Sequence, residues 1–131
     1  MSDDANVPKV GTVAWIDLTV DDAEQVRDFY SLVVGWQPSS VDMDGYCDFN
    51  MNAPASGEPI AGVCHARGSN AGLPAKWMIY IIVEDVEESA QRCTDLGGKV
   101  LVEPKGMGSH GKYCVIEDPA GAVAALFEQA G

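Results

Sequence analysis

The chain has 131 residues, of which 47% are hydrophobic and 21% are charged, a usual composition for one globular domain. Its 20 acidic and 8 basic side chains give a formal net charge of −12. We therefore expect no binding to nucleic acid or to anionic membranes, which select for Lys and Arg clusters. No apolar run approaches the roughly 18 residues of a membrane helix, and the start lacks the features of a signal peptide. These observations predict a cytoplasmic protein with a polar tail over residues 1–9.

The first predicted elements are a strand that ends at Val20 and a helix that follows it. Asp22 can cap this helix, since Gln25 lies three residues further on. Gly35 can end it in a left-handed conformation. The spacing of three and four residues predicts one apolar face, made of Ala23, Val26, Phe29, Tyr30 and Val33.

Three predicted strands follow, at residues 36–40, 46–52 and 58–64. Turn-forming residues separate them, at Asp44-Gly45 and over residues 54–57. Residues 66–75 are predicted to form a linker between this set of elements and the next.

The same order then repeats. Val20 and Val83 each lie 15 positions before a glycine, Gly35 and Gly98. Asp85 can cap a second helix, whose apolar face is predicted to be Val86, Ala90, Cys93 and Leu96. Strands are predicted at residues 99–103, 112–117 and 122–128. The fold class is therefore α+β, with two βαβββ modules in tandem (residues 10–65 and 76–131) forming a curved mixed sheet around a cleft in one domain, residues 10–131.

The order and its motifs resemble the vicinal oxygen chelate superfamily, which includes glyoxalases, bleomycin-resistance proteins and extradiol dioxygenases. The similarity covers about residues 10–130. The motifs that carry it are Asp21-Asp22, Asp28-Phe29-Tyr30, Gly35-Trp36, Val83-Glu84-Asp85-Val86, Leu96-Gly97-Gly98-Lys99-Val100 and Asp118-Pro119-Ala120-Gly121. The resemblance implies paired βαβββ modules and a homodimer.

The resemblance also implies where metal ligands would stand. The matched positions hold Trp15, Met78 and Ala125, and the fourth falls near residues 60–62, which offer no ligand side chain. A divalent cation needs oxygen or nitrogen donors, which these side chains do not supply. We therefore expect neither a metal nor another cofactor.

Alternation along the strands predicts which side chains face the cleft. In the first strand these include Trp15 and Asp17, whereas Ile16, Leu18 and Val20 lie under the helix. In the second module Met78 and Tyr80 face the cleft, whereas Trp77, Ile79, Ile81 and Val83 lie under the helix. The predicted ligand-binding set is Trp15, Asp17, Tyr46, Met78, Tyr80, Tyr113 and Phe127.

Asp17 and Tyr80 are the candidate catalytic residues. Asp17 is either a ligand anchor or general base, or a structural carboxylate held by hydrogen bonds. Tyr80 either donates a hydrogen bond to a ligand or fills the core. His65 and His110 are predicted to be exposed, and the four cysteines to be buried free thiols.

Four functions remain open. The first is metal-free binding of a small aromatic or hydrophobic molecule, as in bleomycin-resistance proteins. The second is a metal-independent isomerase, epimerase or lyase that uses Asp17 as base. The third, less favoured, is a metal-dependent lactoylglutathione lyase or dioxygenase. The fourth is an accessory subunit with a vestigial cleft.

Overall fold

The computed structural model describes residues 9–130, so the predicted tail lies outside the described residues except for Lys9. The elements are β1 (Val13–Val20), α1 (Ala23–Val34), β2 (Gln37–Asp42), β3 (Cys47–Asn52), β4 (Pro59–His65), η2 (Gly68–Asn70), β5 (Trp77–Ile82), α2 (Val86–Asp95), β6 (Lys99–Gly106), η3 (Gly108–His110), β7 (Gly111–Glu117) and β8 (Val123–Gln129). The predicted α+β class and the repeated βαβββ order are confirmed. Within this part of the chain, neither helix is long and apolar enough to cross a membrane.

The described chain forms two compact units. Residues Trp15–Trp77 make up the N-unit, and the C-unit consists of Met78 onward together with the residues up to Ala14. Backbone hydrogen bonds attach the start of the chain to β5, from Gly11 N to Ile82 O (2.8 Å) and from Ile82 N to Thr12 O (2.9 Å). The boundary between the two units therefore falls within β1 and just after Trp77.

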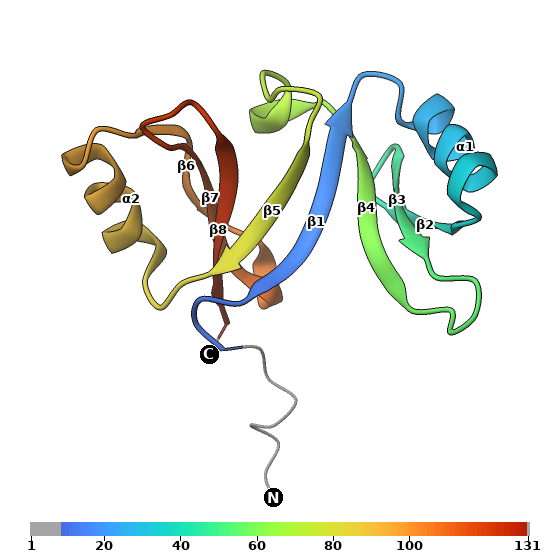
Figure 1. Cartoon of the computed structure of the whole chain (residues 1–131), viewed down its shortest axis with the longest axis horizontal. Coiled ribbons are helices and arrows are strands. Elements are labelled where there is room, and N and C mark those ends of the chain that lie inside the picture. The colour runs from blue at the N-terminus through green and yellow to red at the C-terminus, as the bar shows by residue number, and fades with distance from the viewer. Residues whose placement is uncertain (1–8, 131) are drawn as a thin grey trace, which may run out of the picture. The chain divides into compact units, whose positions relative to one another are not determined.

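In the N-unit the strand order is β2-β3-β4-β1, with β1 parallel to β4 and the other neighbours antiparallel. Helix α1 packs against β2, β3 and β4 of the same unit (Figure 1). Its N-cap is Asp22, whose carboxylate accepts a hydrogen bond from Gln25 N at 3.0 Å. It ends at Gly35, which has a φ of 88°. Both predicted ends of this helix are therefore correct.

The core under α1 contains Ala23, Phe49, Met51 and Val63, with Val20, Val26 and Tyr30 packed against it. The prediction that Phe29 and Val33 belong to this core is wrong, since their exposures are 56% and 65%. Ala23, Val26 and Tyr30 already define the buried stripe. Phe29 and Val33 lie beside that stripe, where the sheet does not reach them.

In the C-unit the strand order is β5-β8-β7-β6, with β5 parallel to β8 and the other neighbours antiparallel. Helix α2 packs against β6, β7 and β8 (Figure 1). Its core contains Val86, Ala90, Cys114 and Leu126, with Ile81 and Val83 packed against it as predicted.

Three predictions about this helical core are wrong. Leu96 is 78% exposed because it stands at the C-cap of α2, beyond the packed turns. Ile79 is also exposed. Trp77 packs in the N-unit core instead, where its indole N–H donates to the Tyr30 hydroxyl at 3.1 Å and its ring lies 6.0 Å from that of Trp36.

Candidate functional site

The sheet of the N-unit has a polar face, on the side opposite α1. Asp17 on β1 and Asn50 on β3 both pair with Gly62 on β4. Val63, the next residue on β4, lies in the core under α1, so these three point the other way. The polar face consists of Trp15, Asp17, Thr19, Asp48, Asn50, Gly62 and Cys64.

Two side chains on β1 approach Gly62 closely and leave little room for a side chain at this position. A Cβ atom at Gly62 would lie 3.1 Å from the Asp17 Cβ and 3.4 Å from the indole of Trp15. The indole therefore covers Gly62, directly beside Asp17. The sequence correctly placed Trp15 and Asp17 on one face, but the pairing with β4 was not visible from the sequence.

Asp17 and Asp48 are buried on this face, with exposures of 7% and 8%. Cys64 lies on the strand between them, with its Sγ 4.0 Å from Asp17 Oδ2. Burial raises the pKa of the Cys64 thiol far above its ordinary value, and the negative charges of Asp17 and Asp48 raise it further. The thiol therefore stays protonated and can act as a weak hydrogen-bond donor.

Asp48 is fixed by His65 at the end of β4. Its Oδ1 accepts a hydrogen bond from His65 N at 2.8 Å and lies 3.3 Å from His65 Nδ1. The prediction that His65 is exposed is wrong, because only 19% of its side chain is accessible. The sequence missed this pair because it depends on the register between β3 and β4, which brings Asp48 next to the end of β4.

Tyr46 directly precedes β3 and contacts the same histidine. The Tyr46 ring meets the His65 ring edge-on, with the two centroids 5.6 Å apart. The Arg67 guanidinium lies 4.0 Å from the centroid of the same Tyr46 ring. These contacts occupy much of the Tyr46 ring. Its predicted role in ligand binding stays a prediction.

The other predicted ligand-binding residues belong to the C-unit. Tyr80 pairs with Ala125, and Tyr113 pairs with Phe127. The neighbouring residues Cys114 and Leu126 lie in the core under α2, so Tyr113 and Phe127 face away from that helix, as predicted. Met78 and Tyr113 are buried. Their roles toward a ligand stay predictions, as does that of Tyr80.

The side chains at the implied metal positions do not fit a metal centre. Trp15 covers Gly62 with its indole, and Ala125 is a fully buried methyl group. Met78 offers only a thioether, a soft donor that suits neither Zn²⁺ nor a hard divalent cation. The donor set therefore lacks the chemistry of a divalent metal site.

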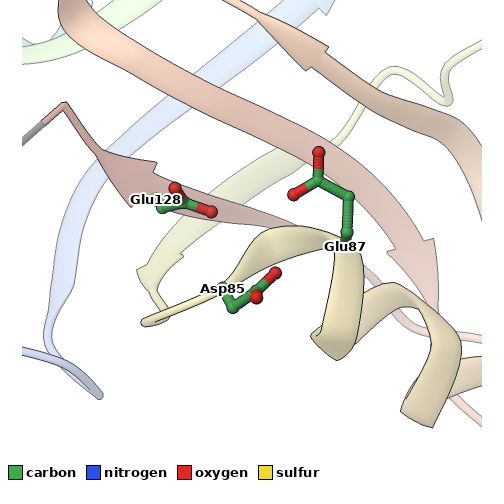
Figure 2. A group of neighbouring side chains, drawn as sticks. All are labelled: Asp85, Glu87 and Glu128. Carbon is green, nitrogen blue, oxygen red and sulfur yellow. The ribbon is translucent and has the colours of Figure 1, made fainter.

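One acidic group in the C-unit brings oxygen atoms close together. Asp85, Glu87 and Glu128 have carboxylate oxygens within 4.8 Å of one another, at the start of α2 and on β8 (Figure 2). Each carboxylate has a structural partner. Asp85 accepts from Glu88 N at 3.0 Å, Glu128 accepts from Val86 N at 2.9 Å, and Glu87 lies 3.3 Å from Lys112 Nζ. Asp85 and Glu128 therefore cap α2, and Glu87 pairs with Lys112 beside them.

The C-unit also has an open groove of about 600 Å³ between α2 and β6. Its walls include Glu87, Gln91, Thr94, Lys99 and Glu103. Several of these side chains are already paired, since Gln91 bonds Asp95 and Lys99 lies 4.0 Å from Glu117. The predicted site residues are not part of this groove. The polar face of the N-unit has the more distinctive chemistry, because the buried carboxylate of Asp17 lies beside the Trp15 indole.

The order of strands and helices in both units defines a protein of the glyoxalase and bleomycin-resistance fold. The chain belongs to the Glyoxalase/Bleomycin resistance protein/Dioxygenase superfamily, whose family model matches residues 12–126.

Among curated proteins, the chain is 30% identical over 124 residues to CFP32 of Mycobacterium tuberculosis (strain CDC 1551 / Oshkosh), a protein provisionally described as a glyoxylase. It is 28% identical over 134 residues to the anthracycline biosynthesis protein DnrV of Streptomyces peucetius. These alignments cover 95% and 91% of the chain but only 46% and 47% of the two relatives. The chain therefore spans about half the length of the curated relatives it matches.

Solved structures show the same fold at low sequence identity. Methylmalonyl-CoA epimerase from Mycobacterium tuberculosis has a TM-score of 0.55 and 16% identity, with 95% of this chain and 93% of that chain covered. A methylmalonyl-CoA epimerase in complex with methylmalonyl-CoA and NH4+ has a TM-score of 0.57 and 16% identity, with 94% and 97% covered. At this identity the likeness establishes the fold alone.

Proposed function

We propose that this chain binds a small organic molecule with a flat aromatic or hydrophobic body, without a metal ion. The observation that carries the proposal is the arrangement of Trp15 and Asp17 at Gly62. An indole covers the glycine, at positions where the family resemblance implies metal ligands, and a buried carboxylate lies directly beside it. The indole can stack on a flat ligand, and the carboxylate can accept hydrogen bonds from its polar end.

The relatives suggest which ligands to test first. One of them is named for anthracycline biosynthesis, which makes flat polycyclic aromatic compounds reasonable probes. Stacking on an indole needs no metal ion. An aromatic or hydrophobic ligand therefore agrees with side chains that offer no metal-binding donors at the implied positions.

Intrinsic tryptophan fluorescence provides the test. We expect the neutral probe 1-naphthylmethanol to quench the fluorescence of Trp15, and Trp15→Ala to weaken its binding at least tenfold. Trp36→Phe is the matched control, since Trp36 packs with Tyr30 and Trp77 in the core under α1. Equal affinity in wild type and Trp15→Ala, or no binding of any flat aromatic probe, would exclude the proposal.

A second candidate function is a metal-independent epimerase, isomerase or lyase. It is favoured by the burial of the Asp17 carboxylate, which lies beside the Trp15 indole on the polar face. Epimerases also share the fold. In this proposal Asp17 removes a proton next to a carbonyl of the substrate. Proton exchange into a bound substrate, measured by NMR in deuterated buffer with EDTA present, should disappear in Asp17→Asn.

We further propose a homodimer in which the exposed side of α1 is covered by a second copy. Phe29, Leu32, Val33 and Val34 are 56%, 88%, 65% and 51% exposed. From Phe29 to Val41 the chain has no charged residue, although its formal net charge is −12. Two copies can therefore meet at this surface without bringing like charges together, which other acidic surfaces do not allow.

A further inference from the structure

Strands β2 and β6 lie at the two ends of the strand order, and each pairs with one neighbour in the described chain. An edge strand exposes backbone N–H and C=O groups, which another strand can join unless charges, proline or bulges prevent it. Strand β6 has all three kinds of protection. Its register with β7 shifts at two places, and its sequence includes Lys99, Glu103, Pro104 and Lys105. This edge is therefore unsuited to pairing with another chain.

Strand β2 lacks most of this protection. Every residue from Gln37 to Asp42 pairs with β3, without a register shift. Asp42 is the only charged residue of the strand, and Pro38 is its only proline. The first four residues of the strand are exposed. Strand β2 therefore offers a regular and nearly uncharged edge.

The hairpin that joins β2 to β3 determines which backbone groups point away from β3. Met43 N donates to Tyr46 O at 2.8 Å, so these two residues form a hydrogen-bonded pair. Bonded and non-bonded pairs alternate along an antiparallel ladder, so Val41 bonds to β3 and its two neighbours do not. The residues whose backbone groups point to the open edge are Pro38, Ser40 and Asp42. A proline with its nitrogen on the open side agrees with this assignment, because an edge strand tolerates proline there.

We propose that two copies of the chain pair through β2, antiparallel to each other and about a two-fold axis at Ser40. In this register the Ser40 N–H of each copy donates to the Ser40 carbonyl of the other. The Asp42 N–H of each copy donates to the partner's Pro38 carbonyl, so the missing N–H of proline costs no bond at that carbonyl. This inference rests on the proposed homodimer and specifies how its two chains meet.

Charge favours a second copy as the partner and Ser40 as the centre. The chain has no charged residue from Phe29 to Val41, although its formal net charge is −12. With the axis at Ser40, each Asp42 lies opposite the partner's Pro38. An axis at Val41 or at Asp42 would bring the two Asp42 side chains to diagonal or opposite positions, where like charges are destabilising. An axis at Pro38 would place two residues without an N–H opposite each other.

The joined sheet also accounts for the exposed side of α1. Ser40 pairs with Phe49, which lies in the core under α1, so the Ser40 side chain is on the face that carries this helix. The two-fold axis of an antiparallel pair is perpendicular to the sheet and leaves both copies of α1 on that face. The two helices therefore present their exposed apolar side chains on the same side of the joined sheet, namely Phe29, Leu32, Val33 and Val34.

Cysteine crosslinking tests the register. In the proposed pairing the two Ser40 Cα atoms are about 5.5 Å apart, within the range of a disulfide. We expect Ser40→Cys to form several-fold more disulfide-linked dimer than wild type in a glutathione redox buffer. Wild type measures the background from the four native cysteines. Ser39→Cys is the matched control and should stay at that background, because its two copies would be about 8 Å apart, too far for a disulfide.

Amide hydrogen exchange of the wild-type chain tests the same pairing without any substitution. We expect the amides of Ser40 and Asp42 to exchange about tenfold more slowly in a concentrated sample, in which the chain is dimeric, than after dilution to the monomer. The amide of Val41 is the internal control, since it bonds to β3 and should be protected in both samples.

The outcomes separate the edge pairing from the homodimer itself. A dimer whose Ser40 and Asp42 amides exchange as fast as in the monomer would overturn the edge pairing and leave the homodimer intact. Equal crosslinking of Ser40→Cys and Ser39→Cys would do the same. A chain that stays monomeric at every concentration would remove the homodimer and this inference together, whatever ligand the polar face binds.

Discussion

Cys114 is the buried thiol with the most direct consequence for stability. It is fully buried in the core under α2, and burial raises its pKa from 9.0 to about 11, with smaller contributions from nearby charged groups. The folded chain therefore holds this proton more tightly than the unfolded chain. Its contribution to stability is present below pH 9 and is lost as the pH rises through 11.

We expect the free energy of unfolding to decrease between pH 9 and pH 11 by on the order of 1–2 kcal/mol more in wild type than in Cys114→Ala. Urea unfolding at a series of pH values measures this difference. Between pH 6 and pH 8 the difference between the two proteins should be constant, which is the internal control. Parallel curves up to pH 11 would contradict the assignment.

At the scale of single residues, the sequence predicted which face of a strand a side chain occupies better than it predicted which residues the side chain contacts. The period of two along β1 placed Trp15 and Asp17 on one face, because alternation is a local property of a strand. The pair formed by Asp48 and His65 was not predictable, since residues 17 positions apart meet only through the pairing of β3 with β4. The stacking of Arg67 on Tyr46 has the same origin.

At the scale of elements, two carboxylates from different parts of the chain cap the start of α2. Asp85 accepts from Glu88 N, and Glu128 reaches from β8 to accept from Val86 N. Both bonds satisfy backbone N–H groups that the first turn of a helix leaves without a partner, and the negative charges lie at the positive end of the helix dipole. The cap therefore satisfies the first turn of α2 and also links the helix to strand β8.

Asp85→Ala should lower the free energy of unfolding by about 1 kcal/mol, the usual effect of removing an N-cap side chain. The midpoint of urea unfolding provides the measurement. Glu84→Ala removes the same charge from the exposed preceding residue and should have a much smaller effect. Equal losses in the two variants would show that charge, and not capping, accounts for the change.

The bounds of strands and helices were well predicted, because capping residues and turn residues mark them in the sequence. The buried side of α1 was predicted less well. Phe29 and Val33 are as apolar as the residues that pack, and only the position of the sheet decides which stripe of a mostly apolar helix is covered. Trp77 shows the same limit, since its partners Tyr30 and Trp36 are distant in sequence.

At the scale of the whole molecule, the exposed side of α1 predicts self-association. We expect light scattering coupled to size exclusion to give the mass of two chains for wild type, and of one chain for Leu32→Lys, which places a charge in the most exposed apolar position of the helix. Val10→Lys, at an exposed apolar residue of the C-unit, should leave the dimer intact. A wild-type monomer at every concentration would refute the prediction.

The side chains at the implied metal positions also predict that metal ions do not change the stability of the fold. Dialysis against EDTA should leave Tm unchanged, and added Zn²⁺, Ni²⁺ or Mn²⁺ should not raise it, whereas saturating a tight site at 100 times its Kd would add about 2.7 kcal/mol. Glu128→Gln is the informative control, since it weakens the acidic cap of α2. A metal-dependent increase in Tm that persists in this variant would show that the implied metal positions bind an ion after all.

The indole over Gly62 also restricts how a lineage with this sequence could regain a metal centre. A Cβ introduced at Gly62 alone would lie 3.1 Å from the Asp17 Cβ, so β1 or β4 would have to shift by a few tenths of an ångström to accept a ligating side chain. Replacing Trp15 alone would expose a bare glycine and gain one donor, which is too few to bind an ion. The two positions are therefore epistatic, because neither change alone creates a site for an ion. Homologues should accordingly hold Trp with Gly, or a pair of ligands, at these two sites, and rarely one of each.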